Sequence, residues 1–215
     1  MVDVEKIERR TVRSFYDDGL FEVAFGLIFL VLGAYFFAET ALPAGSALRA
    51  ALSALFVLVI ISAGFIVNRV VRFLKVRITY PRTGYVAFKT KERSPRRRLA
   101  SGITGALVGA GTAALLGLSP SARTHLPVIN GLVLALVAFF VARKAGVVRL
   151  YALAAVSVIA GFAVTAAGVG DMRGVTVVYA VFGASLIVSG LAALVVYLRR
   201  SPRPEPETPE APDAR

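Results

Sequence analysis

The chain has 215 residues, of which 57% are hydrophobic and only 18% are charged, and its mean hydropathy is +0.72. This composition is too apolar for an ordinary soluble domain of that length, so it predicts a polytopic membrane protein. The absence of cysteine excludes disulfides, thiolate metal sites and cysteine nucleophiles. The formal net charge of +12 would suit nucleic-acid binding, but the charges are distributed along the chain as in a membrane protein.

Residues 1 to 18 are rich in charge, and their apolar residues recur at helical spacing, which predicts an amphipathic helix on the cytoplasmic surface. Six apolar runs of about span length follow, at residues 20 to 38, 50 to 67, 99 to 118, 126 to 142, 150 to 169 and 174 to 198. We therefore expect an all-α integral membrane protein with six transmembrane helices, arranged as three antiparallel hairpins. Helices 1 and 2 would occupy residues 19 to 71, and helices 3 to 6 residues 99 to 198.

The basic residues indicate the orientation of such a chain. In the six-span arrangement, 22 of the 25 Lys and Arg residues lie on one side of the membrane, and only Arg49, Arg123 and Arg173 lie on the other. The positive-inside rule then places both termini in the cytoplasm of a multi-pass cell-membrane protein. Residues 199 to 215 alternate proline with acidic residues, which predicts a disordered tail.

The first run contains Glu22, the one charged residue in the six runs. Gly19, Gly26 and Gly33 repeat every seven residues, and Glu22 lies on the same helix face, which we expect to point into the bundle. An ionisable group inside a membrane can be a proton or cation site. We favour a structural role, because an anion within about one turn of a helix start is stabilised by the macrodipole. On that interpretation Glu22→Gln should leave folding nearly intact.

Residues 72 to 98 form a basic cytoplasmic loop between the second and third runs. Residues 76 to 80 and 85 to 90 alternate in character around the turn sequence PRTG, which predicts a small β-hairpin. The stretch KTKERSPRRR that follows holds six basic residues in ten and should be attracted to anionic headgroups. The candidate surface for anionic lipid or a partner protein consists of Tyr80, Pro81, Arg82, Gly84, Tyr85, Arg96, Arg97 and Arg98.

Small residues predict where helices pack closely. They recur every four residues in the third run, at Gly105, Gly109, Ala113 and Gly117. In the fifth run Ser157, Gly161 and Thr165 have the same spacing. The spacing leaves open whether these faces pack within one chain or between the subunits of an oligomer.

The sequence offers no set of catalytic or cofactor-binding residues. His125 is the only histidine, and it lies in a loop without the cysteines or carboxylates that would complete a metal site. The glycine patterns GAG and GVGDMRG lack the spacing of a dinucleotide-binding turn. We therefore expect no enzymatic activity, no cofactor, no metal and no nucleic-acid partner.

The stretches FYDDGLFEVAFGLIFLVLG and ITYPRTGYVAF together resemble a group of bacterial polytopic membrane proteins without an assigned function. These proteins combine an F-x-D-G-L start of the first span, here FYDDGL with one additional residue, with a cytoplasmic T-x-P-R-x-G-Y-V segment. The resemblance covers about the first 90 residues. It draws attention to Asp18, Gly19, Glu22, Pro81, Arg82, Gly84 and Tyr85.

Two functions remain open at this stage. The first is a non-enzymatic membrane protein whose basic cytoplasmic surface binds anionic lipid or a partner protein. The second is a small transporter or channel, monomeric or oligomeric, with Glu22 and the glycine-rich helix faces lining the path. We favour the first, because the later runs lack the polar groups at depth that solutes need.

Overall fold

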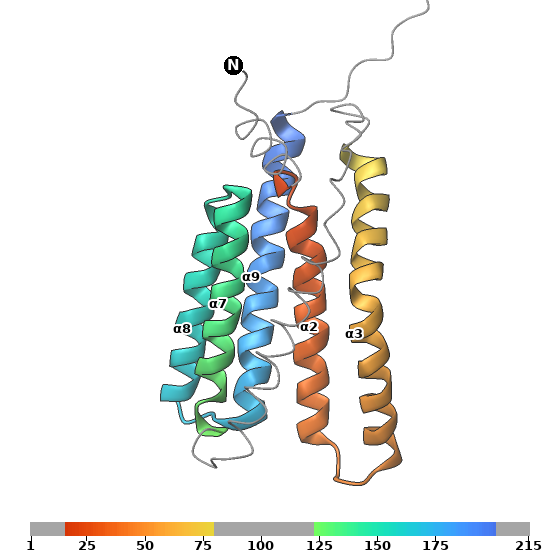
Figure 1. Cartoon of the computed structure of the whole chain (residues 1–215), viewed down its shortest axis with the longest axis vertical. Helices are drawn as coiled ribbons and strands as arrows, with labels where there is room; N and C mark the ends of the chain where they lie inside the picture. Colours follow the sequence, from red (N-terminus) through yellow and green to blue (C-terminus); the bar gives the residue numbers. More distant parts are fainter. Residues whose placement is uncertain (1–15, 80–122, 201–215) are drawn as a thin grey trace, which may run out of the picture.

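The computed structural model describes residues 16 to 79 and 123 to 200. Its elements are α2 (Leu20–Ala41), α3 (Ala47–Leu74), the π-helical turn η1 (Lys75–Thr79), α7 (Leu126–Ala145), α8 (Arg149–Ala166) and α9 (Asp171–Arg200). The long helices lie side by side in an elongated bundle (Figure 1). Helices α2 and α8 run in one direction, and α3, α7 and α9 run in the other (Figure 1). Short turns connect α2 to α3, α7 to α8 and α8 to α9.

Four of these helices, α2, α7, α8 and α9, are long and apolar enough to cross a membrane, as expected for a multi-pass membrane protein. The prediction of six transmembrane helices in three hairpins is therefore wrong. In α3 the apolar segment is shorter, Ala47–Leu58. The helix itself continues through Arg69 and Arg72, so its bounds differ from those of the predicted second run, residues 50 to 67. The third predicted run, residues 99 to 118, lies outside the described residues.

The predicted β-hairpin is also wrong. Residues 76 to 79, which begin its first strand, belong to the helical turn η1, and the described residues contain no β-strand. The backbone N–H of Lys75 bonds to the carbonyls of Val71 and Arg72, so the helix passes into η1 without a break. A short alternating pattern is compatible with either structure, and here the chain continues the helix of α3. The rest of the hairpin lies outside the described residues.

Helices α2 and α9 pack through glycines that repeat every seven residues. A Cβ added at Gly26 would lie 2.7 Å from the carbonyl oxygen of Gly183, and one at Gly183 would lie 2.8 Å from that of Gly26. Gly19 meets Gly190 in the same way. The expectation that this face of α2 points into the bundle is confirmed, and the matching spacing in α9 lets the two backbones approach closely.

Helices α7 and α8 are joined by a second small-residue contact. A Cβ at Gly131 would lie 2.6 Å from the carbonyl oxygen of Ser157, and Gly161 faces the same part of α7. The buried Ser157 hydroxyl donates a 2.8 Å hydrogen bond to the carbonyl oxygen of Gly131. This face of α8 therefore packs within one chain. Gly105, Gly109, Ala113 and Gly117 lie outside the described residues.

Helix α3 is attached to α2 by polar contacts at both of its ends. Near its start, Arg49 donates two hydrogen bonds to Glu39 Oε1, at 2.8 and 3.0 Å. Tyr35 and Phe56 stack beside this pair with ring centroids 3.8 Å apart. At the other end, Lys75 forms an ion pair with Asp18. Because α3 buries little of its apolar surface in the described bundle, these contacts fix its position.

Candidate functional site

A group of buried polar side chains lies at the end of the bundle where α2 begins and α3 ends, at the top in Figure 1. It consists of Asp18, Glu22, Lys75, Arg149 and Ser189, and we call it the charge cluster. Asp18 and Glu22 are each 1% exposed, and Lys75 is 5% exposed. The Arg149 side chain is the most accessible of the four charged groups, at 28%. The cluster joins α2, α3, α8 and α9.

Asp18 ties the end of α3 to the start of α2. Its Oδ2 lies 3.0 Å from Nζ of Lys75, and its Oδ1 accepts the backbone N–H of Leu20 at 3.3 Å. Gly19, between Asp18 and the helix, has a φ of +67°, which a glycine adopts without strain. The turn that Gly19 makes places the Asp18 carboxylate at the helix N-terminus, where a negative charge is favourable.

Glu22 ties α2 to α8 and α9. Arg149 Nε donates to its Oε1 at 2.6 Å, and the Ser189 hydroxyl donates to its Oε2 at 2.8 Å. Arg149 also donates through Nη2 to the backbone carbonyl of Tyr16. Both carboxylate oxygens of Glu22 therefore have hydrogen-bond donors from other helices.

The cluster balances two carboxylates against two cationic groups. A buried charge is costly unless it is paired and hydrogen-bonded, and Glu22 meets both conditions. The arrangement has the character of a structural clamp. It also changes our expectation for Glu22→Gln, because the substitution removes the charge that Arg149 pairs with.

The other residues singled out from the sequence are not among the described members of the charge cluster. Tyr80, Pro81, Arg82, Gly84, Tyr85, Arg96, Arg97 and Arg98 lie outside the described residues. His125 is exposed just before α7, and residues 16 to 79 and 123 to 200 contain no group of three or more side chains suited to a metal ion.

Sequence reasoning missed Lys75, Arg149 and Ser189. Lys75 and Arg149 counted only as basic residues that flank apolar runs, a pattern that does not distinguish a buried cation from an exposed one. One signal for Ser189 was present, because Gly183 and Gly190 repeat at the same interval as the α2 glycines. Pairing the two repeats would have placed α9, and Ser189 with it, beside Glu22.

Comparisons of the chain with protein-family models, curated proteins and solved structures find no match. The resemblance to bacterial membrane proteins with the F-x-D-G-L and T-x-P-R-x-G-Y-V motifs stays a hypothesis that rests on those residues. In the structure the first motif supplies Asp18, Gly19 and Glu22. Two of these residues belong to the charge cluster, and Gly19 packs against α9.

Proposed function

We propose that the protein is a non-enzymatic membrane protein whose basic end faces the cytoplasm and binds anionic lipid headgroups. The observation that carries this proposal is a set of exposed basic side chains at the end of the bundle that holds the charge cluster. We define this basic end by the seven exposed residues Arg69, Arg72, Arg77, Arg143, Lys144, Arg199 and Arg200. In the described part of the chain, the opposite end has only Arg49, Arg123 and Arg173, and Arg49 is paired with Glu39.

The charge cluster does not neutralise this surface. Asp18 and Glu22 are buried and paired with Lys75 and Arg149. Their negative charges are therefore balanced inside the bundle and do not offset the exposed basic residues. Each exposed Lys or Arg near an anionic leaflet contributes about 1 kcal/mol of attraction at low ionic strength. The guanidinium of Arg77 lies 4.7 Å from the ring centroid of the exposed Phe73, and such cation and aromatic pairs suit the membrane interface.

The transport alternative receives less support from the geometry. A titrating transport site must reach the solute and release it, whereas Glu22 is 1% exposed and both of its oxygens accept hydrogen bonds. In the described part of the chain, the glycines on the same helix face meet the backbone of α9, so this face is occupied by a helix contact. These contacts favour a clamp over a conduction site.

The orientation of the bundle in the membrane can be tested by labelling single cysteines, because the chain contains no cysteine of its own. A single cysteine at exposed Lys144 should be protected from a membrane-impermeant maleimide in intact cells and should react after permeabilisation. A cysteine at exposed Arg173, at the opposite end, should react in intact cells. The reverse pattern of labelling would refute the proposed orientation.

Lipid preference provides the functional test. The purified protein should retain more phosphatidylglycerol than phosphatidylcholine from an equimolar mixture, as measured by mass spectrometry of the bound lipid. Replacing Arg143, Lys144, Arg199 and Arg200 with glutamine should reduce this enrichment by roughly tenfold or more, since four basic contacts are lost.

The matched control replaces exposed Arg123 and Arg173, at the opposite end, with glutamine. This control should keep the preference for phosphatidylglycerol. A loss in the control about half as large as in the fourfold variant would show that the attraction depends on net charge alone, and would contradict a lipid surface at the basic end. No loss in the fourfold variant would end the lipid proposal and favour an acidic partner protein.

A further inference from the structure

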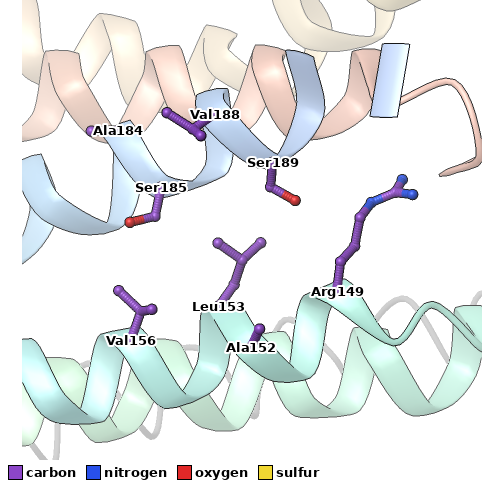
Figure 2. A pocket seen from close by; sticks show the side chains of 8 residues that line it. All are labelled: Arg149, Ala152, Leu153, Val156, Ala184, Ser185, Val188 and Ser189. Atoms are coloured by element: carbon purple, nitrogen blue, oxygen red, sulfur yellow. The ribbon is translucent and has the colours of Figure 1, made fainter. Parts of the chain in front are cut away.

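An open groove of about 410 Å³ runs between α8 and α9, beside the charge cluster (Figure 2). Its walls are mostly apolar, and Arg149 stands at one end. The side chains that line it include Arg149, Ala152, Leu153 and Val156 on α8, and Ala184 and Val188 on α9. The volume is in the range typical of small-molecule sites.

The groove is oriented along the direction in which a membrane lipid lies. Arg149 is the first residue of α8, at the basic end, and Val156 lies seven residues further along the helix. At 1.5 Å per residue, this separation corresponds to roughly 10 Å along the helix axis. One end of the groove is therefore at the height of the lipid headgroups, and the other end lies among the acyl chains.

The ion pair between Glu22 and Arg149 is exposed on one side only. The Glu22 side chain is 1% exposed, whereas that of Arg149 is 28% exposed. A guanidinium has five N–H donors, and the bonds to Glu22 and the Tyr16 carbonyl account for two of them. A group that approaches along the groove therefore meets the cation, while the carboxylate is shielded behind it.

We propose that this groove binds one anionic glycerophospholipid, with its phosphate on Arg149 and the upper part of an acyl chain along Ala152, Leu153 and Val188. The inference rests on the proposed function and assigns a single lipid site to it. A guanidinium binds phosphate oxygens in a planar, two-point geometry. The apolar walls match the chain that follows the headgroup, so charge and hydrophobicity change along the groove in the same order as along a lipid.

The alanines give the groove its width and provide a way to close it. Ala152 on α8 and Ala184 on α9 are both exposed on its walls. A tryptophan at either position would occupy the space of the acyl chain, and Ala184 lies on α9 at the end of the groove away from Arg149 (Figure 2). Ala155 is an exposed alanine on α8 that does not line the groove, so Ala155→Trp is the matched control.

The test uses the full chain in detergent, titrated separately with phosphatidylglycerol and phosphatidylcholine and followed by native mass spectrometry. Ala152→Trp and Ala184→Trp should each weaken the first phosphatidylglycerol binding step by about fivefold or more, because the tryptophan side chain takes the space in which the acyl chain would be buried. Ala155→Trp should bind like the wild type. Far-UV circular dichroism establishes that each variant is folded, and either groove variant alone suffices for the test.

The outcomes separate this inference from the proposed function. Unchanged first-step binding in the folded groove variants overturns the groove site, even if the fourfold variant of the basic end loses its lipid preference. Equal weakening of phosphatidylglycerol and phosphatidylcholine also overturns it, because the site would then not select an anionic lipid. Weakened phosphatidylglycerol binding in the groove variants, with an unchanged fourfold variant, would support the groove and contradict the wider surface.

Discussion

Replacing Arg149 with alanine should lower the free energy of unfolding by about 3 to 5 kcal/mol, because it leaves the buried Glu22 carboxylate without its cationic partner. Glu22→Gln should cost less, since the Arg149 side chain that it leaves behind is 28% exposed and can reach water. Unfolding in mixed micelles of dodecyl maltoside and sodium dodecyl sulfate, followed by far-UV circular dichroism, measures both effects.

The double variant Glu22→Gln with Arg149→Ala should be more stable than Arg149→Ala alone, because no unpaired charge remains in the bundle. Arg173→Ala, which removes an exposed arginine at the opposite end, is the control and should change the unfolding free energy little. If Arg149→Ala behaves like this control, the ion pair does not hold the helices together.

Gly26→Ala should destabilise the bundle by roughly 1 to 3 kcal/mol, because the added methyl group has no room between α2 and α9. Its Cβ would lie 2.7 Å from the carbonyl oxygen of Gly183 and 2.6 Å from Cγ1 of Ile187. The backbone oxygen cannot turn aside, so the two helices must separate. The same micelle titration measures the loss.

Gly33→Ala is the internal control for this contact. It lies one repeat further along the same face of α2, but its nearest contact would be at 3.4 Å, an ordinary van der Waals distance. It should be close to neutral, and alanine even favours the helix over glycine. Equal destabilisation by both substitutions would mean that general helix effects, and not the close approach of α9, explain the result.

Much of the helical architecture could be predicted from apolar composition. The runs at 126 to 142, 150 to 169 and 174 to 198 lie within or close to α7, α8 and α9. Residues that commonly begin or end helices lie at the observed bounds of α7. Pro127 is in its first turn, and Gly146 follows its last residue in the left-handed conformation. Composition failed at residues 76 to 79, where the helical backbone of α3 continues into η1.

The charge cluster could be predicted only in part. The seven-residue repeat of glycines places Glu22 on the α2 face that packs against α9. This repeat can be recognised from the sequence of α2 alone. Arg149 lies 127 positions away along the chain. Nothing in its own neighbourhood distinguishes it from Arg143 or Lys144, which are exposed. Only the packing of α8 against α9, which brings Arg149 to Glu22, identifies the partner.

Headgroup cross-linking tests the binding of anionic lipid at the basic end most directly. The full chain is reconstituted with phosphatidylglycerol that carries a photoactivatable group on its headgroup, irradiated, and digested, and the labelled residues are identified by mass spectrometry. We predict that labels concentrate at residues 69 to 77, 143 to 149 and 197 to 200 and decrease at high salt. Equal or greater labelling at residues 123 to 125 and 171 to 173, independent of salt, would contradict the account.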